Sequence, residues 1–511
     1  MYSFSVVLLC ILQLEALRFL PKSEYNNSLQ VKTTNGFVQG KELATENGRR
    51  FLAFRGVPFA EPPLGDLRFR SPQLPKKWDQ VVDATEDIDS CIEVQARRTG
   101  FQLAGSEDCL YLNVYTPVVK LKVKEKNLPV FFFIYGGAFS EGTSSSSLYG
   151  PGHFIEQNSI LVTANYRTGL FGFLSTQDLA SPGNYGLKDQ RLVLLWIQSN
   201  IRYFGGNPQK VVIMGQSAGG SSVMHHVVSP RSRGLFNAAV SLSGDTLTQW
   251  SNNRRPKSIA EDIALSLGIP FENTTKFIDD LRTLPTMRLQ EANLEAVFVH
   301  TTLLLLDGLP FTPTIEVVHK DAFITDSTYN SLKKGDIAKV PILMGTTSLE
   351  ALFFAGLFDA VRPFLFLCDW SPAILLTRLN IRYTWQKHLV AKMIKKAYFQ
   401  GKFSSSATKE ELAQYFSDIL FSRPFTKTAK LLSKHTDVFF YVYDYPIPAV
   451  KAFYRKLGYF IDTHLKGCAH SEDLGCYFTS EQRPKDIKLS DRDLNHCRRM
   501  RKFLTNFAVF G

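Results

Sequence analysis

The chain has 511 residues, 44% of them hydrophobic and 40 of them phenylalanine, so it can bury a large core. Its formal net charge is +12, but the basic residues are scattered, with small clusters only at 120–126 and 498–502. Neither cluster is interleaved with aromatic residues, which argues against a nucleic-acid partner and favours solvated basic faces.

An apolar run from Phe4 to Leu14 opens the chain. It is too short to span a bilayer but has the length of the hydrophobic region of a signal peptide, although no lysine or arginine precedes it. We expect a signal peptide at 1–16 and one domain at 17–511; a hydrophobic leading strand is the alternative. No later run is apolar and long enough to span, so no stable membrane insertion is expected.

Secretion predicts glycosylation and disulfides. N-x-S/T sequons occur at Asn26 and Asn273. Cys91 and Cys109 enclose a short polar segment, and a bridge between them would close a small loop. No C-x-x-C pair is present, so we expect no structural metal. The pairing of the other cysteines stays open: Cys368, Cys468, Cys476 and Cys497.

The segments 31–34 and 37–41 predict a hairpin around Asn35-Gly36. Leu110–Tyr115 alternates like a strand, and a continuous apolar run then ends in Gly136-Gly137, as a buried strand entering a tight loop would. Beyond it, strands and helices alternate. The predicted strands are 160–165, 210–214, 239–242, 340–344 and 438–443, and the clearest helix is 188–204.

This alternation predicts an α/β fold with a mostly parallel sheet covered on both faces. The segments 250–335 and 355–430 have a largely helical pattern and are expected to be insertions or a cap.

The strand-like run Val211–Met214 ends in G-Q-S-A-G, which places Ser217 where a nucleophile elbow would hold it. The five-residue pattern alone is weak, because glycine and serine are common. A serine nucleophile needs a base and an acid that orients the base, in the chain order serine, acid, histidine. His470 lies in a loop after a strand, and Glu350 closely follows another strand. Either could instead be an ordinary surface loop residue.

An oxyanion hole needs backbone N–H groups directed at the developing negative charge. The loop Tyr135–Phe139 follows a buried strand and offers such a backbone. A simple glycine turn is the alternative.

Several longer motifs extend this pattern along the chain. They are F-R-G-V-P-F-A-E-P-P-L-G-D-L-R-F, E-D-C-L-Y-L-N-V-Y-T-P, N-Y-R-T-G-L-F-G-F-L, P-G-N-Y-G-L-K-D-Q, W-I-Q-S-N-I-R-Y-F-G-G-N-P and G-L-F-N-A-A-V-S-L-S-G. In this order the chain resembles the type-B carboxylesterases of the cholinesterase-like α/β-hydrolase family, and the motif around Asp473-Leu474-Gly475 is most similar to arthropod esterases.

The resemblance implies a nucleophile Ser217, an acid Glu350 and a base His470. It implies three further sets: oxyanion donors on Gly137, Ala138 and Ala218; substrate-binding rings on Phe139, Phe353 and Phe354; and a Cys91–Cys109 disulfide with structural salt bridges Arg68–Glu107 and Arg167–Asp189.

The chain departs from the family pattern at several positions. The family usually has glutamate at the position of Gln216. Juvenile hormone esterases resemble this chain in having glutamine there. No tryptophan lies between Cys91 and Cys109, where cholinesterases use one to bind quaternary ammonium, so a choline ester is a poor candidate. The sequence also ends where family members usually continue, so a C-terminal anchor or a signal for retention in the endoplasmic reticulum stays open as an alternative.

The prediction is a secreted serine carboxylesterase that acts on a small-molecule ester without a cofactor, its oligomeric state open. A juvenile hormone esterase is the alternative among enzymes. A non-catalytic cholinesterase-like adhesion protein is the alternative from another class, and the filled serine, glutamate and histidine positions argue against it.

Overall fold

A computed structural model describes residues 29–119, 127–302, 308–370 and 384–510. Its centre is a nine-stranded mixed sheet in the order β14-β13-β12-β11-β9-β10-β8-β4-β3. The strands of this sheet are β3 (Lys41–Ala44), β4 (Arg50–Pro58), β8 (Tyr111–Thr116), β9 (Leu128–Ile134), β10 (Ile160–Ala164), β11 (Gly206–Gln216), β12 (Ala238–Leu242), β13 (Ile342–Thr347) and β14 (Val438–Tyr443).

Six neighbouring strands, from β14 to β10, run parallel, and β8, β4 and β3 continue the sheet antiparallel. Strands buried on both faces are continuous apolar runs, and β9, β10 and β12 have this character. The α/β-hydrolase prediction is therefore confirmed, and the predicted strands after residue 110 all form within a few residues of their expected bounds.

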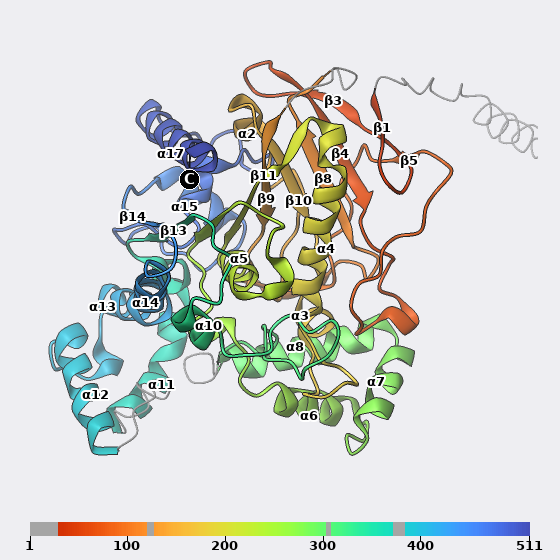
Figure 1. The fold of residues 1–511 in the computed structure, drawn as a ribbon. Coiled ribbons are helices and arrows are strands. Elements are labelled where there is room, and N and C mark those ends of the chain that lie inside the picture. Colours follow the sequence, from red (N-terminus) through yellow and green to blue (C-terminus); the bar gives the residue numbers. More distant parts are fainter. Residues whose placement is uncertain (1–28, 120–126, 303–307, 371–383, 511) are drawn as a thin grey trace, which may run out of the picture.

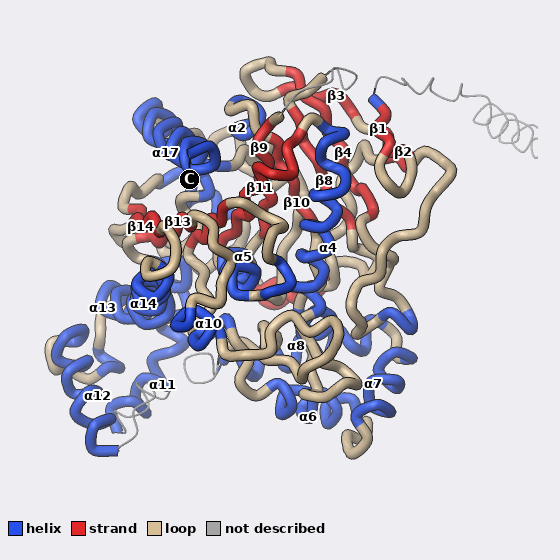
Figure 2. Tube along the Cα trace, viewed as in Figure 1, coloured by secondary structure: helices blue, strands red, loops and turns tan. Residues whose placement is uncertain are grey.

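Helices flank the sheet (Figures 1 and 2). α5 packs on β11 and β12, and α17 contacts β11. The α-helices are α2 (Gly152–Glu156), α3 (Gly169–Phe173), α4 (Tyr185–Asn200), α5 (Ala218–Val228), α6 (Pro256–Leu267), α7 (Thr274–Thr283), α8 (Thr286–Thr302), α10 (Thr328–Lys334), α11 (Phe358–Trp370), α12 (Thr384–Phe399), α13 (Lys409–Ser417), α14 (Arg423–Leu432), α15 (Pro448–Lys456), α16 (Leu474–Tyr477) and α17 (Asp491–Phe510).

The two predicted insertions are largely helical, as expected. α6, α7 and α8 gather at the bottom of Figure 1, and α11, α12 and α13 project at its lower left. None of the described helices is long and apolar enough to cross a bilayer.

Two small sheets lie outside the main one. The predicted N-terminal hairpin forms as β1 (Gln30–Lys32) and β2 (Phe37–Gln39), with β5 (Val82–Asp83) beside β2. The second is the hairpin of β6 (Glu93–Arg97) and β7 (Gly100–Ala104), which the sequence did not predict.

Both salt bridges that the resemblance implied are present and buried. Arg68 binds Glu107 and Arg167 binds Asp189, each with a shortest N–O distance of 2.6 Å. Each guanidinium donates two hydrogen bonds to its carboxylate, the planar geometry for which arginine is suited.

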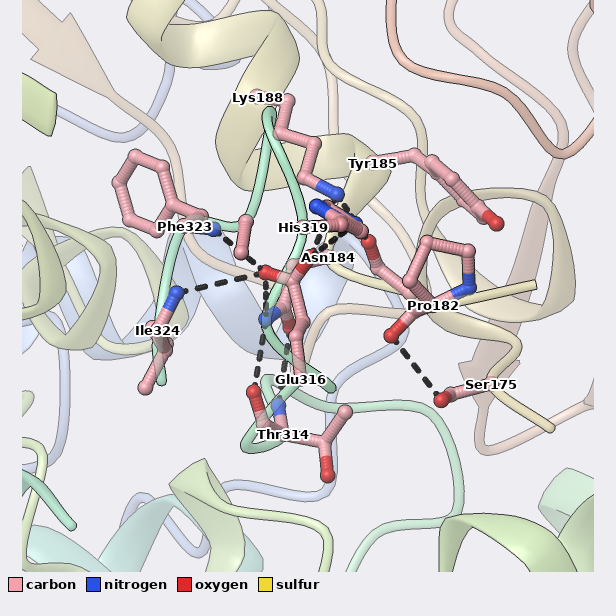
Figure 3. Close-up of polar contacts among 12 residues, drawn as sticks. Ser175, Pro182, Asn184, Tyr185, Lys188, Thr314, Glu316, His319, Phe323 and Ile324 are labelled. Atoms are coloured by element: carbon pink, nitrogen blue, oxygen red, sulfur yellow. Dashed lines mark hydrogen bonds and ion pairs between the residues drawn. The ribbon is translucent and has the colours of Figure 1, made fainter. Parts of the chain in front are cut away.

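A further buried ion pair fastens the segment before α10 to α4 (Figure 3). Lys188 Nζ lies 2.6 Å from Glu316 Oε2, and the other carboxylate oxygen accepts hydrogen bonds from Asn184 Nδ2 and Phe323 N at 2.8 Å. His319 Nε2 lies 3.3 Å from the same carboxylate. Glu316 is thus satisfied on both oxygens, as a buried charge must be.

Two disulfides are formed. Cys91–Cys109, implied by the resemblance, is confirmed. Cys476–Cys497 joins α16 to α17, although the sequence suggested no partner for Cys497. The sequence alone did not reveal this pairing, because it depends on how α17 packs against α16. Cys468 is a buried free thiol. The proposed signal peptide and Asn26 lie outside the described residues; Asn273 is exposed and caps α7.

Candidate active site

Ser217 stands at the junction of β11 and α5. Its backbone has φ 58° and ψ −124°, a sparsely populated combination for a non-glycine residue and typical of a nucleophile elbow. The turn depends on Gly219, where an added Cβ would overlap the carbonyl of Ile134. β11 and α5 therefore approach each other closely, and Ser217 lies on the sharp turn between them at the carboxyl end of the strand.

Glu350 and His470 come together at the same edge. Glu350 begins a 3₁₀ segment just after β13, and His470 lies in the loop before α16. Glu350 Oε2 accepts a hydrogen bond from His470 Nδ1 at 2.6 Å, and the carboxylate is fully buried. Burial alone would raise the pKa of Glu350, but the charge and hydrogen bond of His470, with two hydroxyl donors, hold that pKa below its usual value.

Those hydroxyl donors were not predicted. Ser243 Oγ donates to Glu350 Oε1 at 2.6 Å, and Thr346 Oγ1 donates to the same oxygen at 2.7 Å. The N–H of Thr347 adds a third bond at 2.7 Å. Ser243 follows the end of β12 and the threonines end β13, so polar residues at the carboxyl ends of predicted strands were the signal that could have found them.

The second nitrogen of His470 has an unexpected partner. Its Nε2 lies 3.0 Å from the side-chain amide nitrogen of Gln216, which also donates to Ser471 Oγ at 2.6 Å. When the imidazole is neutral and Nδ1 donates to Glu350, Nε2 carries the lone pair and accepts from Gln216. Within the described residues Ser217 Oγ forms no hydrogen bond with His470, and catalytic hydrogen bonds often tighten only when substrate binds.

The loop after β9 brings backbone N–H groups to the serine. Gly137 has φ 115°, and a Cβ there would overlap the carbonyl of Glu141; Ala138 is also left-handed, with φ 57°. Within the described chain, the N–H groups of Gly137 and Ala138 donate to no protein acceptor. Ala218 is the first residue of α5, so its N–H has no acceptor inside the helix.

A cavity of about 620 Å³ opens over these groups. Ser217, His470 and the loop Gly136–Ala138 line it, as do the half-buried rings of Phe353 and Phe354. The two ring centroids lie 5.9 and 6.3 Å from the imidazole of His470. The volume of the cavity falls within the range of small-molecule binding sites.

Phe139 requires a correction. Its ring is fully buried and packs edge-to-face on Phe173 at 5.2 Å, so it belongs to the core and does not line this cavity. Phe421, which the sequence did not single out, packs on the imidazole of His470 at 4.9 Å between centroids.

The comparison with protein families rests on almost the whole chain. The model of the Carboxylesterase family matches residues 27–511. The chain belongs to this family. As a member it is a carboxylic-ester hydrolase, which confirms the enzyme class predicted from the motifs.

Among curated carboxylesterases, venom carboxylesterase-6 of Apis mellifera is 33% identical over 494 residues, covering 94% of this chain and 86% of the relative. Juvenile hormone esterase of Tribolium castaneum is 32% identical, covering 94% and 83%. The crystal structure of juvenile hormone esterase from Manduca sexta, with OTFP covalently attached, superposes with a TM-score of 0.82 at 27% identity, covering 94% of this chain and 90% of that one. The predicted likeness to arthropod esterases is confirmed.

Proposed function

We propose that this carboxylesterase uses Ser217 as a covalent nucleophile, His470 as general base and acid, and Glu350 as the carboxylate that orients the imidazole. The observation that carries the proposal is the 2.6 Å bond between His470 Nδ1 and buried Glu350. That bond fixes the tautomer in which Nε2 can accept a proton. Its two residues lie after β13 and before α16, and His470 lines the same cavity as Ser217.

The reaction begins when Ser217 Oγ attacks the ester carbonyl and its proton passes to His470 Nε2. Nε2 must first exchange its bond to Gln216 for one to Ser217. The carbonyl oxygen becomes an anion, for which the N–H groups of Gly137, Ala138 and Ala218 are the proposed donors.

The tetrahedral intermediate then collapses. The C–O bond to the alcohol breaks, and the imidazolium gives its proton to the leaving oxygen, so the acyl group stays on Ser217. Water next attacks the acyl carbonyl while His470 takes its proton, and a second collapse releases the acid and restores the serine. No cofactor enters this sequence.

The substrate class proposed is a small ester with an apolar acyl or alcohol group. Phe353 and Phe354 offer the apolar contact inside the cavity. Secretion is also proposed. It is supported by the disulfides Cys91–Cys109 and Cys476–Cys497, because such bonds persist in oxidising compartments.

The test is Ser217→Ala. We expect kcat for 4-nitrophenyl butyrate to fall by roughly 10⁴- to 10⁶-fold, the range for loss of a serine nucleophile. A fluorophosphonate probe should label the wild type on the peptide that contains Ser217 and leave the variant unlabelled. Mass spectrometry reads the label.

Ser221→Ala is the matched control. This serine lies one turn along α5, is fully buried, and its Oγ has no hydrogen-bond partner in the described part of the protein. Its loss should leave both labelling and turnover near wild type. A folded wild type that neither turns over esters nor takes the label would instead support a non-catalytic binding protein.

A juvenile hormone esterase is the second candidate. Gln216, the Tribolium castaneum relative and the superposed Manduca sexta structure favour it. The discriminating measurement is kcat/KM for juvenile hormone III against 4-nitrophenyl and naphthyl esters. A preference of several hundredfold for the hormone would select the specialised function, and comparable values would select a general carboxylesterase.

A further inference from the structure

A second cavity, of about 700 Å³, adjoins the ester-binding cavity. Arg98 and Lys456 line both, so the two share a wall. That wall is made by the turn of the β6–β7 hairpin and the carboxyl end of α15. The backbone N–H of Arg98 donates to Gly458 O at 2.8 Å, which joins these two elements.

The lining of the second cavity is cationic. Its twelve residues include five lysines or arginines and one histidine, and no aspartate or glutamate. The basic residues are Arg98, Lys451, Arg455, Lys456, Lys466 and His464. Like charges gathered in a concave site repel one another and focus a positive potential, so the arrangement favours an anionic occupant.

Four of these cations are available to a ligand. Arg98, Arg455, Lys456 and Lys466 are exposed, and none of them makes an ion pair in the part of the chain that the structure describes. Lys451 differs, because it is buried and its Nζ donates to the carbonyl of Gly467 at 2.5 Å.

Two of the four are also held in place. The guanidinium of Arg455 donates to Ile461 O at 3.1 Å, and that of Arg98 reaches Arg455 O at 3.5 Å. These bonds are to neutral carbonyls, so they position the side chains without neutralising their charge. The partial negative charge at the C-terminus of α15 accounts for Arg455 and Lys456 in its last turn. It does not account for Arg98 and Lys466, which come from other segments and line the same cavity.

A short path connects this wall to the catalytic groups. Arg97, next to Arg98, binds Glu141 at 2.6 Å, and the N–H of Glu141 donates to Gly137 O at 3.0 Å. Glu93 and Glu141 are the only carboxylates among the described lining residues of the ester-binding cavity. Glu141 is paired with Arg97, and Glu93 is buried and accepts from Gly142 N at 2.6 Å. Neither carboxylate lines the second cavity, where the exposed cations gather.

Resting on the proposed esterase function, we propose that Arg98, Arg455, Lys456 and Lys466 form an anion-binding subsite at the mouth of the ester-binding cavity. The subsite receives a carboxylate, phosphate or sulfate group that the substrate carries at the end remote from the scissile ester. Guanidinium groups suit all three oxyanions because they donate paired hydrogen bonds. The enzyme would therefore prefer anionic esters whose length spans the two cavities.

The test compares two ester series with the purified enzyme. One contains mono-4-nitrophenyl esters of dicarboxylic acids of increasing chain length, and the other contains the same esters capped as neutral methyl esters. In the wild type, kcat/KM should favour the anionic series at one range of lengths. Arg98→Gln/Lys456→Gln should lower kcat/KM for those anionic esters by about 5- to 30-fold, the effect of losing two partly exposed ion pairs.

Four controls sharpen the result. Neutral esters should lose much less kcat/KM than the anionic esters in that variant, and added salt should abolish the anionic preference of the wild type. Lys456→Gln/Lys466→Gln should act in the same direction. Lys257→Gln/Lys333→Gln removes two exposed charges that line neither cavity, and it should leave the preference intact.

The proposal would be overturned if the Arg98/Lys456 variant lost kcat/KM equally for both ester series, or if the Lys257/Lys333 control lost as much. It would also be overturned if the Arg98/Lys456 variant lost binding to anionic vesicles but kept the wild-type ester preference. Competition by inorganic phosphate rather than acetate at equal ionic strength would assign the subsite to phosphate groups, and the reverse to carboxylates.

If no ester is turned over, the proposed function fails. Saturable calorimetric binding of the free dicarboxylate, lost in the Arg98/Lys456 variant, would still support the subsite.

Discussion

Asp245 is a fully buried carboxyl group that follows β12 and accepts a hydrogen bond from Thr428 Oγ1 at 2.7 Å. Burial raises its pKa to about 7, although the bond from Thr428 acts in the opposite direction. The folded protein therefore binds this proton more tightly than the unfolded chain does. Stability from Asp245 is complete below about pH 4, the ordinary range of the group, and is lost as the pH rises through 7.

Asp245→Asn should remove this pH dependence. Between pH 4 and pH 8 the free energy of unfolding of the wild type should fall by up to about 4 kcal/mol more than that of the variant. Urea denaturation at several pH values measures the difference. Asp486→Asn, an exposed carboxylate, is the control and should keep the wild-type slope. Parallel slopes for wild type and Asp245→Asn would contradict the assignment.

At the scale of elements, the Lys188–Glu316 pair joins α4 to the segment that precedes α10. Lys188→Met should lower the free energy of unfolding by about 3–5 kcal/mol, because it leaves a buried carboxylate without its counter-charge. Denaturant unfolding at pH 7 measures it. Lys276→Met breaks an exposed pair with Asp280 and should cost less than about 1 kcal/mol. A loss as small for Lys188 as for Lys276 would show that the remaining donors satisfy Glu316.

The strands and the elbow could be predicted because each depends on a local pattern. An apolar run such as Val211–Met214 can only be a buried strand or helix, and the glycines after it require a sharp turn. Side-chain partnerships across distant segments are different. The bonds of Ser243 and Thr346 to Glu350 depend on how two strand ends meet, and the burial of Phe139 depends on its packing against Phe173 of α3.

At the scale of the whole molecule, Cys91–Cys109 and Cys476–Cys497 close short loops near the two ends of the chain. Each loop, with separations of 18 and 21 residues, should contribute about 3 kcal/mol in the chain-entropy account.

Cys476→Ser/Cys497→Ser should lower the Tm of the purified enzyme in differential scanning calorimetry, since α17 would lose its covalent attachment to α16. Cys468→Ser, which changes a free thiol, is the control for the loss of sulfur atoms and should have a smaller effect. An unchanged Tm in the double variant would show that packing alone holds α17 against the sheet.

The chemistry and the walls of the site come from different parts of the fold. Ser217, Ser243 and Thr346 lie at the ends of parallel strands in the sheet, where a displacement would disturb the whole core. One part of the cavity wall comes instead from the β6–β7 hairpin and α15, which the central sheet does not need for its pairing. Under the proposed function, we expect mutations in that part of the wall to change which esters enter without displacing Ser217, Glu350 or His470. Exchange of this hairpin and helix end would therefore alter the entrance of the site on an unchanged sheet.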